Sequence, residues 1–280
     1  MGPESKQPEQ QGDRNRVAVP GGQLAYEAAG TGTSIVFIHA AIADRRMWDR
    51  EFHTYSRGHT VVRYDRRGFG QSSPATAPYS EIEDLRAILD HLRLGPSTIV
   101  GCSNGGGLAL ELALEHPATV KALLLVATGV SGFDGSTDPD GKPDYDADGV
   151  RLKEVFKAWT AGRKDEALQR LQEYWCSMQT GQGLELVRQM MRDNADEIFT
   201  DASAQHNTPL VPPALPRLKS IRVPTTVLYG DHDEPTGGWI ARRVAREIPE
   251  AQFVPVSGAD HLVNLSRPDA FDTALRRLLG

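Results

Sequence analysis

Short apolar runs alternate with amphipathic segments along most of the chain from about residue 16. Four of the runs resemble parallel strands, which are apolar throughout when both faces of their sheet are covered. The runs predict strands over 17–19, 24–28, 34–38, 60–64, 97–100, 120–126, 223–229 and 251–256. Helical spacing predicts helices over 47–55, 80–92, 104–115 and 268–279. This alternation predicts an α/β fold, a mostly parallel sheet flanked by helices.

Two local signals support these elements. Pro20-Gly21-Gly22 lies between the first two runs and predicts a hairpin turn. Ser80 is followed three residues later by Glu83, the capping-box spacing that begins a helix.

The pattern changes after the sixth predicted strand. Residues 131–149 are rich in Gly, Pro and Asp, and helical stretches follow at about 150–161, 164–177 and 184–198. We therefore expect residues 131–210 to form a small helical lid inserted into a core made of residues 16–130 and 211–280. Residues 1–15 are polar and rich in Gln, Glu and Pro, which predicts a disordered tail rather than a secretory signal.

Composition narrows the classes of protein. The 280 residues are 39% hydrophobic and carry 31 Lys and Arg against 37 Asp and Glu, a formal net charge of −6. This balance argues against a nucleic-acid partner, and no stretch approaches the roughly 18 apolar residues of a membrane span. Cys102 and Cys176 are too few for a disulfide framework, so we expect a cytoplasmic protein. The oligomeric state stays open.

Gly101-Cys102-Ser103-Asn104-Gly105 stands between a predicted strand and a predicted helix. This is the G-x-S-x-G pattern between a strand and a helix, where it forms a sharp turn. The turn exposes the serine and needs small residues two positions before and after it. Ser103 is therefore the candidate nucleophile. Cys102 is the rival, but a turn centred on it would put Val100 and Asn104 where small residues are required. We expect Cys102 to face the core.

A serine hydroxyl needs a base and an acid to become a good nucleophile. The strand predicted at 223–229 is followed by Asp231 and Asp233, and the next strand by His261, so these groups come after the carboxyl ends of strands. Either aspartate could orient the histidine. Asp231, directly after Gly230, could instead brace the loop.

Four motifs together resemble the α/β-hydrolase superfamily. They are His39-Ala40-Ala41, Asp65-Arg66-Arg67-Gly68-Phe69-Gly70-Gln71-Ser72, the turn at Ser103, and Gly230-x-x-Asp233 with His261. Within that superfamily, the stretch from Trp48 through Tyr64 to Asp84 is most similar to 3-oxoadipate enol-lactonase and to small esterases and perhydrolases.

The resemblance implies a role for each matching residue. Ser103 would be the nucleophile, His261 the general base and Asp233 the acid that orients it, with no cofactor and no metal. The backbone amides of Ala41 and Asn104 would form an oxyanion hole, although Ala40 stands where the family usually has glycine. The segment from Asp65 to Gly70 would be a structural corner, in which Asp65 and an arginine tie loops together beneath the site.

An acidic segment, residues 134–148, suggests a different chemistry. Asp144-x-Asp146-x-Asp148-Gly149 matches the opening of a calcium-binding loop, but Val155 occupies the twelfth position, where such a loop has a glutamate. The sequence favours a flexible acidic loop with Asp148 capping the next helix. It leaves calcium binding undecided.

The sequence thus predicts a serine hydrolase that cleaves an ester or lactone of a small to medium apolar molecule. Two alternatives stay open: a C–C bond hydrolase or lyase with the same triad, and a non-catalytic ligand-binding protein of this fold. We expect large apolar residues of the lid to pack and some of them to line the pocket, namely Trp159, Trp175, Met178, Met190 and Met191.

Overall fold

The computed structural model describes residues 15–137, 142–200 and 206–280. Its centre is an eight-stranded sheet in the order β1-β2-β4-β3-β5-β6-β7-β8. The first two strand pairings, β1–β2 and β2–β4, are antiparallel and the others are parallel. The strands are β1 (Arg16–Val19), β2 (Gly22–Ala29), β3 (Ser34–Ile38), β4 (Thr60–Tyr64), β5 (Ser97–Cys102), β6 (Val120–Val126), β7 (Thr225–Gly230) and β8 (Gln252–Val256).

The predicted fold class is confirmed, and each predicted strand end lies within two residues of the observed one. The hairpin turn is also confirmed, because Val19 pairs with Gly22 and Gly21 adopts a positive φ of 76°. Strand prediction succeeds here because the central strands are covered on both faces. Every residue of β3, β5 and β7 is buried.

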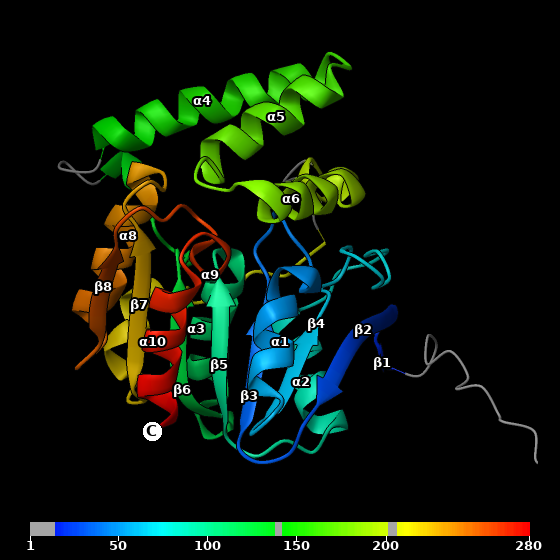
Figure 1. Ribbon diagram of the computed structural model, residues 1–280, viewed down its shortest axis with the longest axis vertical. Helices are drawn as coiled ribbons and strands as arrows, with labels where there is room; N and C mark the ends of the chain where they lie inside the picture. Colours follow the sequence, from blue (N-terminus) through cyan, green and yellow to red (C-terminus); the bar gives the residue numbers. More distant parts are fainter. Residues whose placement is uncertain (1–14, 138–141, 201–205) are drawn as a thin grey trace, which may run out of the picture.

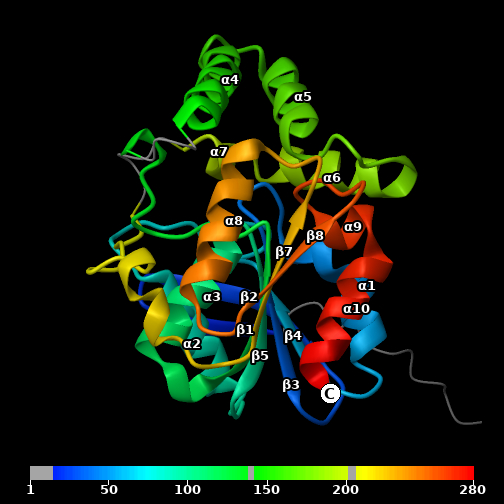
Figure 2. The same cartoon turned by 90° about the vertical axis from the view of Figure 1, so that its left-hand side faces the viewer.

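Helices cover both faces of the sheet (Figure 2). On one face lie α1 (Asp49–Tyr55), α9 (Val263–Ser266) and α10 (Pro268–Leu279), and on the other α2 (Glu81–His91), α3 (Asn104–Glu115) and α8 (Pro235–Glu247). Trp48 packs between Phe37 and Phe271 on the first face, with ring centroids 5.0 and 5.7 Å apart. Ser80 caps α2 as predicted by accepting a bond from the Glu83 amide at 3.3 Å.

The α-helices described between β6 and β7 lie beyond the carboxyl ends of the parallel strands (Figure 1). They are α4 (Lys142–Thr160), α5 (Lys164–Trp175), α6 (Gly181–Asp193) and α7 (Ala195–Ile198). We call residues 142–200 the helical insertion. Its buried Val155, Leu171 and Met190 join the hydrophobic cluster on the α1 and α10 side of the sheet. The division of the chain into core, lid and tail stays a prediction, and the tail falls outside the described residues except for Asn15.

The prediction of a flexible acidic loop is wrong for residues 142–148, because they form the first turns of α4. Asp148 lies inside this helix and not at its cap. Its carboxylate accepts bonds from the backbone amide (3.2 Å) and hydroxyl (2.6 Å) of Thr236 at the start of α8, while Asp144 accepts one from Trp239 Nε1 at 3.1 Å. The aspartates therefore attach α4 to the core. Asp138 and Asp140 lie outside the described residues.

Among the described residues, no helix has the length and apolar character needed to cross a membrane.

Candidate active site

Ser103 lies at the end of β5 and directly before α3, in a strained backbone conformation. Its φ of 56° and ψ of −120° belong to a region that costs a non-glycine residue roughly 1–3 kcal/mol. Four backbone hydrogen bonds hold the turn. The Ser103 amide donates to Val126 O at 2.9 Å, and its carbonyl accepts from the amides of Gly106, Gly107 and Gly129 at 2.9–3.1 Å. The geometry is that of the predicted sharp turn, with a partly exposed serine at its tip.

The glycines around Ser103 have a steric reason. A Cβ on Gly101 would overlap the backbone of Gly105, and a Cβ on Gly105 would lie 2.5 Å from the carbonyl oxygen of Ile38. Neither position accepts a side chain without moving the backbone. Cys102, between Gly101 and Ser103, is fully buried, as its predicted orientation toward the core requires.

His261 and Asp233 form a buried pair beyond the ends of β8 and β7. His261 Nδ1 lies 2.9 Å from both carboxylate oxygens of Asp233, and the two residues are 4% and 7% exposed. Asp231 is exposed and bonds the Gly258 amide at 2.7 Å, so it braces the loop. Of the two candidate acids, the structure brings Asp233 to the histidine.

The electrostatics of the pair favour a protonated imidazole. Burial alone would lower the pKa of His261, but the charge and hydrogen bond of Asp233, with contributions from Glu234 and Asp260, raise that pKa above its ordinary value. Glu234 is half-buried beside Asp233, and its desolvation followed by the Asp233 charge raises its pKa to about 8. His261 therefore faces a strongly acidic environment.

A hydrogen bond from Cys102, the residue before Ser103, joins the serine turn to the histidine loop. The Cys102 thiol donates to the carbonyl oxygen of His261 at 3.6 Å, although the two residues are 159 positions apart. The Ser103 hydroxyl has no hydrogen-bond partner among the described residues. Among the described residues, the structure thus contains the histidine–aspartate bond but no hydrogen bond between Ser103 and His261.

The helical insertion supports the histidine loop. The His261 amide donates to the carbonyl of Trp175 at 3.1 Å, and the two rings lie 5.6 Å apart. Asp260 is fully buried and accepts bonds from the Met178 amide at 3.0 Å and from Gln179 Nε2 at 2.9 Å. The position of the candidate base thus depends on residues 175–179.

Ala41 and Asn104 lie on the wall of one cavity of about 360 Å³. Asn104 is the first residue of α3, so its amide has no acceptor within the helix. In the described part of the chain, the Ala41 amide also has no hydrogen-bond partner. The two amides predicted to hold an oxyanion are both unpaired and border the same cavity.

A second cavity of about 480 Å³ lies between the helical insertion and the loop after β7. Asp233, His232 and Glu234 border it from the core, and helices α4 and α5 border it from the insertion. Asn104 borders the first cavity and Asp233 the second, whereas Ser103 and His261 are in the wall of neither.

Four of the five apolar residues singled out in the insertion pack against other side chains, and the fifth, Met178, is exposed. Met190 and Met191 are buried, Trp159 stacks on Phe199 with centroids 4.1 Å apart, and Trp175 packs beside His261. None of the five predicted residues borders either cavity. The expectation that some of them line the pocket therefore fails for both.

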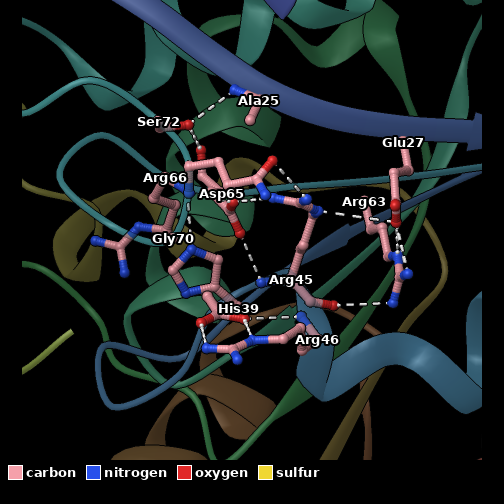
Figure 3. A network of polar contacts seen from close by, with 12 residues as sticks. Ala25, Glu27, His39, Arg45, Arg46, Arg63, Asp65, Arg66, Gly70 and Ser72 are labelled. Atoms are coloured by element: carbon pink, nitrogen blue, oxygen red, sulfur yellow. Dashed lines mark hydrogen bonds and ion pairs between the residues drawn. The ribbon is translucent and has the colours of Figure 1, made fainter. Parts of the chain in front are cut away.

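The corner below the site is structural, as predicted. Asp65 is fully buried and accepts bonds from the Arg45 amide at 2.9 Å, the Gln71 amide at 2.8 Å and the Arg45 guanidinium (Figure 3). His39 joins this corner to the loop of Ala41. Its Nε2 accepts from the Arg66 amide at 2.8 Å and its Nδ1 donates to Ala40 O at 2.8 Å, while burial and the Arg66 charge lower its pKa to about 3.

Arg66 is a residue that the sequence did not single out as part of the site. It is 6% exposed and borders the cavity at Asn104 together with Glu81 and Glu197. One signal in the sequence could have pointed to Arg66: it belongs to the Asp65–Gly70 corner, directly before Arg67. Its partners come from distant elements, so its orientation could not be read locally.

One group of the described residues has suitable spacing for a metal ion. Single ligand atoms of Asp233, Glu234 and His261 lie within 4.8 Å of one another. The Nδ1 atom of His261 is directed at Asp233 in this arrangement, so the imidazole nitrogen already has a partner. The three residues are therefore the hydrogen-bonded His261–Asp233 pair and the neighbouring Glu234.

A family model described as alpha/beta hydrolase family matches residues 35–274, and the chain belongs to this family. A putative non-heme bromoperoxidase, BpoC, from Mycobacterium tuberculosis is 25% identical over 266 residues, which cover 92% of this chain and 97% of that protein. The structure of Est816, titled an N-acyl homoserine lactone degrading enzyme, is 25% identical with a TM-score of 0.69 and covers 94% of this chain and 99% of its own. The crystal structure of the enol-lactonase from Burkholderia xenovorans LB400 shares the fold, with a TM-score of 0.75 and 24% identity. The match covers 94% of this chain and 99% of that one.

Proposed function

We propose that the protein is a serine hydrolase that cleaves an ester or lactone through an acyl-enzyme. Ser103 is the nucleophile, His261 the general base and Asp233 the acid that orients the imidazole. The observation that carries the proposal is the buried His261–Asp233 pair, with Nδ1 2.9 Å from the carboxylate, at the sheet edge where Ser103 occupies its strained turn. The similarity to a protein titled as a lactone-degrading enzyme supports this substrate class.

The chemistry follows from the positions of these groups. His261 takes the proton of Ser103 as the hydroxyl attacks the carbonyl carbon, and the amides of Ala41 and Asn104 stabilise the oxyanion that forms. His261 then gives the proton to the leaving alcohol. Water, activated by the same imidazole, hydrolyses the acyl-enzyme and regenerates Ser103. Asp233 fixes the tautomer in which Nδ1 carries the proton.

The two cavities suggest how a substrate is divided. The leaving alcohol receives its proton from His261, so we place it on the side of Asp233, in the cavity of about 480 Å³. The acyl part then occupies the cavity of about 360 Å³ beside Ala41 and Asn104. In this arrangement the helical insertion serves as the lid of the alcohol side. A cytoplasmic location and the absence of nucleic-acid and membrane partners stay predictions.

Labelling with a fluorophosphonate probe tests the proposal. Intact-mass measurement should show one adduct on the wild type and none on Ser103→Ala, and only the wild type should hydrolyse a short-chain p-nitrophenyl ester. Ser220→Ala is the matched control, because this serine is exposed, donates to Arg217 O at 2.8 Å and borders neither cavity, and the variant should keep both labelling and turnover. A labelled protein without ester turnover would favour C–C cleavage or lyase chemistry. Absence of both would favour a ligand-binding protein.

A further inference from the structure

Arg66 carries a hydrogen-bond donor that nothing in the described chain satisfies. Its Nε and one terminal nitrogen both bond Glu81 Oε1, at 2.8 and 2.6 Å. The other terminal nitrogen, NH1, is buried and has no partner among the described residues. A buried donor of a charged group without an acceptor is costly. Figure 3 shows the guanidinium extending away from the Asp65–Arg45 contact, and its Cζ lies 5.4 Å from the ring centroid of Phe69.

The cavity that Arg66 borders is the one beside the two unpaired amides. Arg66, Glu81 and Glu197 form part of its wall, together with Ala41 and Asn104. The Glu197 side chain has no hydrogen bond within the described ranges. Its carboxylate lies where a Cβ on Gly68 would be, against the same corner. Besides the two amides, the wall thus offers a donor on Arg66 and an acceptor on Glu197 that have no partner among the described residues.

The charges of this wall indicate what fits there. The guanidinium of Arg66 is already matched by Glu81, whose second carboxylate oxygen is 3.4 Å from Asn207 Nδ2. Glu197 adds a further carboxylate, so an anionic group would meet two glutamates and one arginine. A cationic group would have to lie beside the guanidinium. An uncharged group that both accepts and donates a hydrogen bond satisfies both free groups without adding charge.

We propose that Arg66 and Glu197 bind an uncharged hydrogen-bonding group, such as an amide, on the acyl part of the substrate. The carbonyl oxygen of this amide accepts from Arg66, and the amide N–H donates to Glu197. This inference rests on the proposed hydrolase function, which places the acyl part in this cavity. It replaces the apolar acyl chain expected from the sequence with a polar one and makes Arg66 a specificity-determining residue.

Matched substrates test the proposal on the wild type, where folding is not in question. The p-nitrophenyl esters of 3-acetamidopropanoic acid and of its hydrocarbon isostere, 5-methylhexanoic acid, differ in the amide alone. We expect kcat/KM to favour the amide ester about tenfold, the usual size of one hydrogen bond to a charged group. The mono-p-nitrophenyl ester of adipic acid, which carries a carboxylate, should be the poorest of the three. Equal rates for amide and hydrocarbon, or a preference for the anion, would overturn the proposal.

Arg66→Lys assigns the preference to the arginine, because lysine keeps the charge opposite Glu81 but has its donors on a single nitrogen and so has none at the position of the free terminal nitrogen of Arg66. The amide preference should fall to near unity in this variant. Arg67→Lys is the matched control: Arg67 lies next in the chain and holds Asp84 with two bonds of 2.8 and 2.7 Å, but it does not border the cavity. This variant should keep the wild-type preference. A preference that survives in Arg66→Lys contradicts the assignment.

A binding measurement separates failure of this inference from failure of the proposed function. Ser103→Ala cannot form an acyl-enzyme, and calorimetry can compare its affinity for the methyl esters of the same two acids. We expect the amide ester to bind about tenfold more tightly. If the wild type turns over no ester but this difference remains, the hydrolase proposal fails and the polar site stands. If esters turn over through Ser103 and neither readout favours the amide, the polar site fails alone.

Discussion

The serine side and the histidine side of the candidate site are constructed in different ways. Ser103 is held by a backbone hydrogen bond that it donates to β6 and by bonds that it accepts from glycines, which follow within a few residues or lie on the adjacent loop. His261 is held by Asp233 and by the helical insertion, through Trp175 and the Asp260–Gln179 contact. The first arrangement is mostly local and steric. The second depends on side chains that come together only in the folded chain, so the two sides should respond differently to substitution.

The largest effect is expected at the acid. Asp233→Asn should lower kcat by about 10³–10⁴-fold, because an amide no longer fixes the tautomer of His261 or stabilises the imidazolium. Asp231→Asn is the control, since Asp231 braces the loop from an exposed position. Steady-state kinetics on a p-nitrophenyl ester measures both. A larger loss at Asp231 would reverse the assignment of the acid.

The steric character of the serine side is tested by Gly105→Ala. The added Cβ would lie 2.5 Å from Ile38 O and 2.7 Å from His39 O. We therefore expect the free energy of unfolding to fall by about 3 kcal/mol. Gly149→Ala in α4 is the matched control, because a Cβ there meets nothing within 4 Å. It should stabilise the protein by about 0.5–1 kcal/mol. Denaturant titration measures both changes. Equal effects would mean that the turn adapts readily.

The dependence of the histidine side on the insertion is tested by Gln179→Ala. This change removes a donor to the buried Asp260 carboxylate, and we expect the free energy of unfolding to fall by about 1–3 kcal/mol. Activity should fall with it, because Asp260 precedes His261. Gln189→Ala, which removes an exposed bond of 2.7 Å to Asp193 on α6, should change neither. Thermal unfolding and ester kinetics provide the measurements. If Gln179→Ala changed neither stability nor activity, the position of His261 would not depend on the helical insertion.

The smallest effect concerns pH. Because the folded environment raises the pKa of His261, the imidazole stays protonated to a higher pH than an ordinary histidine and becomes an effective base only above it. We expect kcat/KM to rise with pH through a midpoint above 6.5, the ordinary value. Asp233→Asn should move this midpoint downward. A wild-type midpoint below 6.5, or a rate without pH dependence, would disagree with this environment.

The same contrast explains what could be read from the sequence. The central strands and α3 were predictable because burial on both faces and regular apolar spacing are local signals. So was the serine turn, because a Cβ on Gly101 would overlap the backbone of Gly105 only four residues later. The start of α4 was not, because Asp144 and Asp148 find their partners on α8, far along the chain. Arg66 was overlooked for the same reason, since Glu81 and His39 define its position from other elements.

The acyl-enzyme itself provides the most direct test of the account. Rapid mixing of the wild type with a p-nitrophenyl ester, followed by acid quenching and mass spectrometry of the peptides, measures the covalent intermediate and the release of p-nitrophenol together. The account predicts a burst of p-nitrophenol approaching one equivalent per chain and an acyl group on the peptide that contains Ser103. Turnover that continues in Ser103→Ala, or an acyl group on another residue, would contradict it.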